Sequence, residues 1–132
     1  MRRFAKEGPL SCQAISGTNV VLLAFDVDRD QASDILGFSV ERLDHTEGRR
    51  AWLRNDLRFD VVKDSPDPEV KEQWGTNFNP LQTFLWGDYT AKPNNTYTYL
   101  VSAVTGTPGE ELTPKHSVRL QVHMEQPKDQ GV

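Results

Sequence analysis

The twelve residues DVDRDQASDILG, which begin at Asp26, contain the side chains that most directly suggest chemistry. Asp26, Asp28 and Asp30 are spaced like the oxygen donors at the first, third and fifth positions of a helix-loop-helix calcium loop. That loop also needs a glycine at its sixth position and a glutamate at its twelfth, where this chain has Gln31 and Gly37. The favoured interpretation is a strand that runs into a short helical turn, capped by Asp28 and with Gln31 reaching back to the cap. A looser calcium site on the three aspartates stays open.

Other residue types that perform catalysis are present without the spacing that catalysis needs. His45, His116 and His123 fall in different predicted elements, so no metal-binding set is expected. Asp44, His45 and Glu47 could be drawn as an acid–base set, but a hydrophilic turn is the favoured interpretation. No nucleophile elbow or glycine-rich phosphate loop occurs. The sequence therefore predicts no catalytic residues and no cofactor.

The charge and the cysteine content of the chain limit which binding partners and which cellular compartment are expected. The 132 residues carry a formal net charge of −4, which argues against a nucleic-acid partner. The basic cluster Arg49, Arg50 and Arg54 lies beside acidic residues and is interpreted as a solvated turn. Cys12 is the single cysteine and cannot form an internal disulfide, which favours a reducing compartment. Without a signal peptide or a membrane-spanning segment, a cytoplasmic location is expected.

The periodicity of apolar residues is mostly two, the period of a strand with one buried face. Residues 19–27 are apolar at both parities, so a central strand covered on both faces is predicted there. The remaining predicted strands cover residues 10–16, 37–44, 51–54, 81–86, 96–104 and 117–124. The strand pattern at residues 51–54 is the weaker one. About seven short strands separated by turn residues, with almost no helical pattern, predict an all-β antiparallel sandwich.

Two regions depart from this rhythm. Residues 55–80 contain no long alternating run, and a loop of this length in a compact domain is either functional or hides a strand. Trp74 and Phe78 in this region are candidates for an interaction surface. Trp52, Trp74 and Trp86 are also candidate stacking platforms for sugars or bases, although core packing is the favoured use of Trp86. We predict one domain over residues 1–125, and a linker or truncated tail over residues 126–132.

The segment PNNTYTYLVSAV, from Pro93 to Val104, resembles the sixth strand of fibronectin type III domains. The segment ILGFSVERLD similarly resembles the third strand of that fold. The resemblance implies a fibronectin type III or immunoglobulin-like sandwich in which Tyr97 is a tyrosine corner, its hydroxyl bonded to backbone just upstream. It departs from the family where Phe25 takes the place of the usual tryptophan and Ala91 that of a leucine.

A broader resemblance covers most of the chain. The pieces NVVLLAFDVDR, ILGFSVERLDHTEGRRAWLRN and NPLQTFLWGDYTAKPNNTYTYLVSAV are together similar to the amino-terminal segment of bacterial phospholipase D-like proteins. In that family the segment precedes catalytic domains with a histidine, a lysine two residues on and an aspartate four residues beyond the lysine. Two positions after each histidine this chain has Glu47, Val118 and Glu125. The resemblance therefore implies an accessory module without enzyme activity of its own.

The sequence leads to one main hypothesis and three alternatives. The main hypothesis is a non-catalytic module that docks to the catalytic body of a larger phospholipase D-like protein, to another protein or to a substrate, and not to nucleic acid or membrane. The alternatives are a secreted carbohydrate-binding or adhesive sandwich, a small calcium-binding sandwich, and a small free-standing hydrolase.

Overall fold

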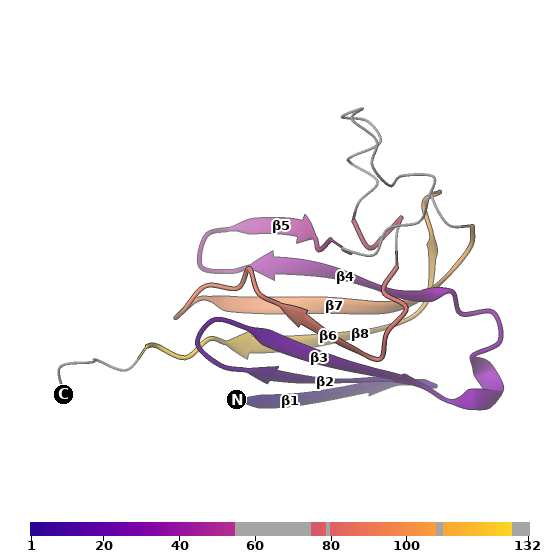
Figure 1. Ribbon diagram of the computed structural model, residues 1–132, viewed down its shortest axis with the longest axis horizontal. Coiled ribbons are helices and arrows are strands. Elements are labelled where there is room, and N and C mark those ends of the chain that lie inside the picture. The colour runs from indigo at the N-terminus through magenta and orange to yellow at the C-terminus, as the bar shows by residue number, and fades with distance from the viewer. Residues whose placement is uncertain (55–74, 79, 108–109, 128–132) are drawn as a thin grey trace.

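A computed structural model describes residues 1–54, 75–78, 80–107 and 110–127, which form two stacked antiparallel sheets (Figure 1). Sheet A has the strand order β1-β2-β3-β6: β1 (Arg2–Glu7), β2 (Leu10–Ser16), β3 (Val21–Val27) and β6 (Leu85–Asp88). Sheet B has the order β5-β4-β7-β8: β5 (Arg49–Trp52), β4 (Gly37–Asp44), β7 (Thr96–Thr105) and β8 (Thr113–His123). This arrangement confirms the predicted all-β antiparallel sandwich.

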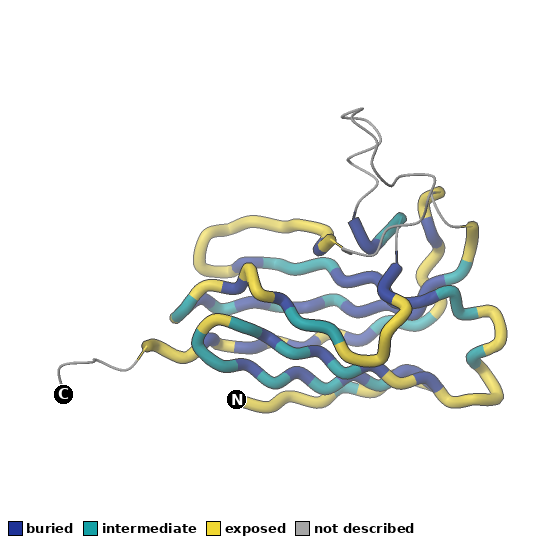
Figure 2. The backbone as a smooth tube through the Cα atoms, viewed as in Figure 1, coloured by how far each residue is buried: buried dark blue, intermediate teal, exposed yellow. Residues whose placement is uncertain are grey.

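The core lies between the two sheets, because alternate residues of each strand point to opposite faces. In β3 the residues at every second position from Val21 to Val27 are buried, and in β8 the buried residues are Val118, Leu120 and Val122. Phe25 of sheet A stacks on Phe38 of sheet B with ring centroids 4.7 Å apart. Figure 2 shows the buried positions concentrated on the inner strands, while β1 and β5 are mostly exposed.

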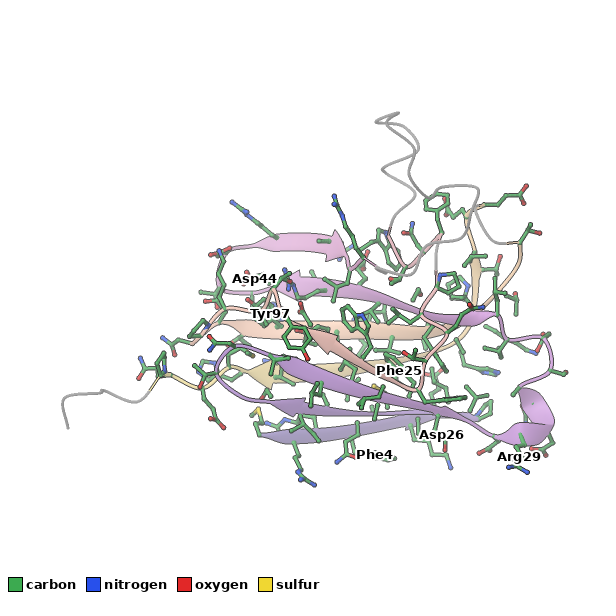
Figure 3. The ribbon with its side chains drawn as sticks, in the orientation of Figure 1. Phe4, Phe25, Asp26, Arg29, Asp44 and Tyr97 are labelled. Atoms are coloured by element: carbon green, nitrogen blue, oxygen red, sulfur yellow. The ribbon has the colours of Figure 1, made fainter. Side chains whose placement is uncertain are left out.

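The Tyr97 side chain is also fully buried between the sheets, as Figure 3 shows. Its hydroxyl accepts a hydrogen bond of 2.8 Å from the backbone N–H of Lys92. This is the upstream backbone bond that the resemblance to a tyrosine corner predicts.

Strand β1 is an eighth strand that the sequence pattern did not predict. Only Ala5 of its six residues is partly buried, so this edge strand has no alternating apolar pattern. The strand predicted at residues 81–86 begins later, at Leu85, because Leu81 instead exchanges backbone hydrogen bonds with Phe38. A Cβ atom on Gly37 would lie 2.5 Å from the Leu81 carbonyl oxygen, so the glycine permits this close approach instead of ending the preceding turn.

Two further expectations for the region around β3 were wrong. The strand was predicted to be covered on both faces, yet Leu22 and Ala24 on its second face are only half-buried and Asp26 is exposed. The following turn is the short 3₁₀ helix η1 (Arg29–Gln31), in which the Gln31 N–H donates to the Asp28 carbonyl at 3.0 Å. The Asp28 side chain makes no capping bond. The described part of the chain contains no helix that is long and apolar enough to span a membrane.

Candidate functional site

The outer face of sheet A, the face turned away from the core, carries exposed apolar side chains. The register places Phe4 beside Gln13, then Ala24, then Leu85, and residues paired in this way share a face. The next row along the strands brings Ile15 beside Leu22. Phe4 is 68% exposed and Leu85 is 62% exposed. We name this surface the sheet A face and define it as Phe4, Ile15, Leu22, Ala24 and Leu85.

The outer face of sheet B mixes apolar residues, Leu43, Trp52 and Leu100, with polar residues, several of which bond to one another. The hydroxyls of Ser102 and Ser117 are 2.7 Å apart, and Thr98 Oγ1 lies 2.7 Å from a ring nitrogen of His45. His123 makes a similar contact of 2.8 Å with the Thr96 hydroxyl. These contacts give six polar side chains of this face a partner within the molecule.

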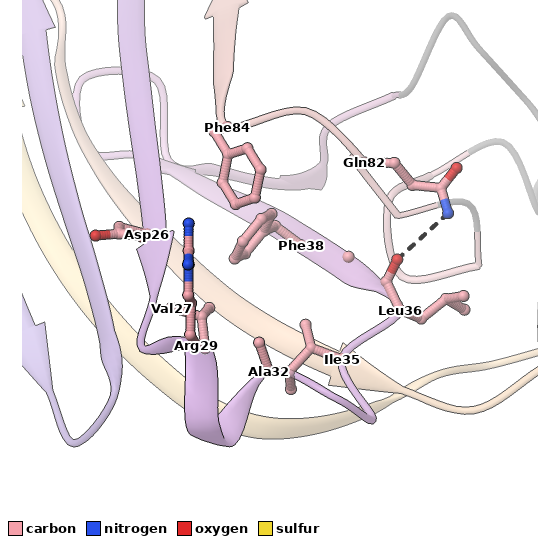
Figure 4. Close-up of a pocket in the computed structure, with 10 residues that line it drawn as sticks. Asp26, Val27, Arg29, Ala32, Ile35, Leu36, Phe38, Gln82 and Phe84 are labelled. Carbon is pink, nitrogen blue, oxygen red and sulfur yellow. Dashed lines mark hydrogen bonds between the residues drawn. The ribbon is translucent and has the colours of Figure 1, made fainter.

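A cleft of about 450 Å³ opens where β3 passes into η1, close to the segment before β6 (Figure 4). Its apolar wall includes Phe38 and Phe84, whose rings meet edge to face at 6.2 Å. Gln82 closes part of the rim through a bond of 3.4 Å to the Leu36 carbonyl. Asp26 belongs both to the outer surface of sheet A and to the lining of this end cleft, so the two surfaces adjoin.

A second cleft, of about 460 Å³, lies along the side of the sandwich between β5 and β6. We name it the aromatic cleft because Trp52, Trp86 and Tyr89 line it. Trp86 points inward, on the same face as Leu23, and packs partly against the core, as predicted for this tryptophan. Gly87 faces outward beside Leu22, and a Cβ on it would lie 2.7 Å from the Tyr89 ring, so glycine is needed for this ring to lie over the outer face of sheet A.

A buried polar network joins the two sheets at the base of the aromatic cleft. Arg42 Nη1 donates to Asp88 Oδ2 at 2.8 Å and to the Thr90 hydroxyl at 2.7 Å. The Tyr99 hydroxyl donates to the same Asp88 oxygen at 2.6 Å, and Arg42 Cζ lies 4.8 Å from the centroid of the Tyr97 ring. The guanidinium is therefore fixed by a carboxylate, a hydroxyl and an aromatic face.

This environment shifts the pKa values of two members of the network. Burial alone lowers the pKa of Arg42, but the charge and hydrogen bond of Asp88 outweigh it, and the pKa is raised. Burial is the largest cause that raises the pKa of Tyr99, and the neighbouring Asp88 carboxylate adds to it. Arg42 is therefore a permanent cation, and Tyr99 is a neutral hydrogen-bond donor at ordinary pH.

The residues predicted as an interaction surface are only partly placed. Trp74 lies outside the described residues. Phe78 is half-buried, and its N–H donates to the Gly75 carbonyl at 3.0 Å in a turn. Of the three aspartates of the calcium hypothesis, Asp26 points away from the end cleft in Figure 4. Among the described residues, no group of three or more His, Cys, Asp and Glu side chains could hold a metal ion.

The other sequence candidates are found in structural roles. Asp44 Oδ1 accepts the backbone N–H groups of Thr46 and Glu47 at 2.9 and 3.0 Å, and Oδ2 accepts from Asn95. Desolvation raises the pKa of Asp44, but these three hydrogen bonds outweigh it, and the pKa lies below its usual value. The carboxylate therefore shapes the β4–β5 turn, as the favoured interpretation of this stretch had it.

Two clusters were not found by reasoning from the sequence. The sheet A face was missed because β1 has no alternating pattern and because Phe4 and Leu85 are isolated apolar residues in the sequence. The Arg42–Asp88 pair joins residues 46 positions apart, and no motif marks either of them. The apolar residues at the second parity of residues 19–27 were a usable signal, since Leu22 and Ala24 belong to the sheet A face.

Comparison with known proteins adds no relative from which a function could be transferred. No family model, no curated protein and no solved structure matches this chain.

Proposed function

We propose that the chain is a non-catalytic docking module, and that it binds another protein domain through the sheet A face. In the form that the sequence resemblance suggests, this domain is the catalytic body of a larger phospholipase D-like protein. The module would hold that body in place and would itself make or break no bond.

The observation that carries the proposal is the apolar character of one outer face. Phe4 and Leu85 lie in the same row, with two strands between them, and most of the surface of each is exposed to water. Exposed apolar side chains that cluster on one face are typical of protein–protein contacts, in which they form the dry centre. The adjoining end cleft is large enough to receive one apolar side chain of a partner.

The charges around the face indicate the chemistry of the partner surface. Arg2 shares the outward parity of β1 with Phe4 and Lys6, so two cations border the apolar centre on one edge. A partner with an apolar patch bordered by carboxylates would complement this arrangement.

Two observations support the finer family assignment. The bond between the Tyr97 hydroxyl and the Lys92 backbone is the tyrosine-corner contact expected for a fibronectin type III-like sandwich. Phe25 stacks on Phe38 between the sheets, so it packs in the core at the position where the family has a tryptophan.

The test requires the reading frame beyond the codon for Val132. If it continues into a body with the histidine-lysine-aspartate motif, that body is produced separately and its affinity for the module is measured by calorimetry. Leu85→Gln should weaken association at least tenfold, because a polar side chain would replace an apolar contact. Leu100→Gln on the outer face of sheet B is the matched control and should bind as the parent does.

Equal affinity of the Leu85→Gln and Leu100→Gln variants would contradict docking through the sheet A face. A stop codon directly after Val132 would contradict the larger-protein form of the proposal. Trp74 and Phe78 remain predicted contacts, and Trp74→Ala tests them in the same titration. Unchanged binding by that variant would remove Trp74 from the interface.

A further inference from the structure

The outer surface of sheet A is built from rows whose two ends differ in chemistry. One row across the four strands consists of Arg2, Ile15, Leu22 and Gly87. The Tyr89 ring lies over Gly87 at the β6 end of this row, and the residue is 76% exposed. The row therefore has a cation at its β1 end, an aromatic ring at its β6 end and two aliphatic side chains between them.

Two further rows run beside the first. The middle row consists of Phe4, Gln13, Ala24 and Leu85. The third row consists of Lys6, Ser11 and Asp26. Within the described part of the chain, Arg2, Lys6 and Asp26 have no ion-pair partner. The cations of this surface therefore lie along β1, whereas its carboxylate and the Tyr89 ring lie on the half formed by β3 and β6.

A second copy of the same surface could cover it in two ways. Sheets that pack face to face lie about 10 Å apart with their strands aligned within about 30°. A closed dimer of two such faces has its two-fold axis in the plane between them. An axis along the strands places β1 of one copy over β6 of the other and keeps each row opposite itself. An axis across the strands places β1 over β1 and reverses the order of the rows.

We propose that the sheet A face binds the same face of a second copy of this chain, with the two-fold axis along the strands. The inference rests on the proposed docking role, and it names the partner of the free module. In this arrangement Phe4 faces Leu85 of the second copy, and Ile15 faces Leu22 of the second copy. Each of these apolar side chains then meets another apolar side chain, which gives the contact a dry centre.

The charged residues favour the same arrangement. Arg2 of one copy lies opposite the exposed Tyr89 ring of the other, where a guanidinium is attracted to the ring face. Asp26 lies opposite Ser11 of the second copy, with Lys6 of that copy on the neighbouring strand. An axis across the strands would instead bring Arg2 over Lys6 of the second copy, which is a contact between like charges.

The size of the surface predicts a weak dimer. Four strands about 4.8 Å apart, with five residues of each strand at about 3.3 Å per residue, give a face of roughly 15–20 Å in each direction. This area is below the roughly 800 Å² per partner of a standard stable interface. The dimer should therefore dissociate on dilution, and a domain that binds the sheet A face more tightly should displace the second copy.

Sedimentation equilibrium of the complete 132-residue chain tests the inference. The average mass should rise with concentration from that of one chain toward that of two. Leu85→Gln should weaken self-association at least about tenfold, because a polar side chain would replace the apolar contact with Phe4. Leu100→Gln on the outer face of sheet B is the matched control and should associate as the parent does.

A charge reversal tests the direction of the two-fold axis. Lys6→Asp should weaken the dimer severalfold, because it places a second carboxylate near Asp26 of the other copy. The double variant with Lys6→Asp and Asp26→Lys should regain most of the parent affinity. Both positions are exposed, so neither change depends on repacking of the core. A stronger dimer of the Lys6→Asp variant would indicate an axis across the strands and would overturn the proposed arrangement.

The outcomes separate this inference from the docking role. A chain that stays monomeric up to about 1 mM, or a Leu85→Gln variant that associates as tightly as Leu100→Gln, would overturn self-association through this face. Docking would still stand if Leu85→Gln weakened binding of the separately produced catalytic body. Conversely, a parent dimer that Leu85→Gln weakens, together with equal affinity of both variants for that body, would support self-association and contradict docking.

Discussion

The outer faces of the two sheets are built from the same kind of alternating strand, yet their side chains serve different purposes. On sheet B many outward residues are polar, and several bond to one another, as Ser102 does to Ser117 and Thr98 to His45. The apolar residues Leu43 and Leu100 on this face are half-buried. On sheet A the outward residues include Phe4 and Leu85, which remain mostly exposed. The comparison teaches that several polar side chains of one face bond within the molecule, whereas the other face has exposed apolar surface that a contact would cover.

This comparison would be wrong if the exposed residues of sheet A were needed for the stability of the fold. Phe25 and Leu85 belong to neighbouring strands of that sheet but to opposite faces. Phe25→Ala should lower the free energy of unfolding by about 4 kcal/mol, because it removes the ring that stacks on Phe38 and leaves a cavity. Leu85→Ala should change it by less than about 0.5 kcal/mol. Urea unfolding followed by tryptophan fluorescence measures both.

A loss of about 2 kcal/mol or more in the Leu85→Ala variant would contradict the comparison, since Leu85 would then be needed for stability. A small change leaves the apolar face without a structural purpose in the isolated chain. Docking would then be the function that this face still supports.

The same two faces show how much the sequence predicts. Alternation predicted the inner residues of β7 and β8 and the sandwich itself, because burial on one face imposes a period of two. It could not predict β1, whose residues are mostly exposed and whose position follows from backbone pairing with β2. Nor could it predict the aromatic cleft, because the fold alone brings Trp52 and Arg42 to the side of β6. Local pattern reveals burial, whereas a site made of distant residues depends on topology.

A second test compares the turns at one end of the two sheets. The β4–β5 turn of sheet B is held by the Asp44 carboxylate, whereas the β2–β3 turn of sheet A is closed by a backbone bond from the Gly17 N–H to the Val20 carbonyl. Because the folded-state pKa of Asp44 is lowered, its contribution is present above the unfolded pKa of about 3.9. That contribution is lost as the pH falls through the folded pKa. Sheet B should therefore be the more acid-sensitive side at this end.

The corresponding variant is Asp44→Asn, which should lower the free energy of unfolding by about 1 kcal/mol at pH 7. The gap between parent and variant should shrink steadily between about pH 5 and pH 2, as the parent carboxylate becomes protonated. Amide exchange at Thr46 and Glu47 should accelerate over the same range, while that of Gly17 should not. A gap that is constant over this range would show that the charge of Asp44 contributes nothing to the turn.

The mildest test concerns the two faces of β2 and should leave stability nearly unchanged. Cys12 points into the core, and burial raises the pKa of its thiol to about 12, so almost no thiolate forms at pH 8. Ser11 is the preceding residue and points to the outer surface of sheet A, where it is half-exposed. In the folded Ser11→Cys variant, iodoacetamide should alkylate only the cysteine at residue 11. Cys12 should be alkylated only after the protein unfolds. Mass spectrometry distinguishes the singly and doubly alkylated products. Rapid alkylation of both cysteines in the folded variant would contradict the burial of one face of β2 and the exposure of the other.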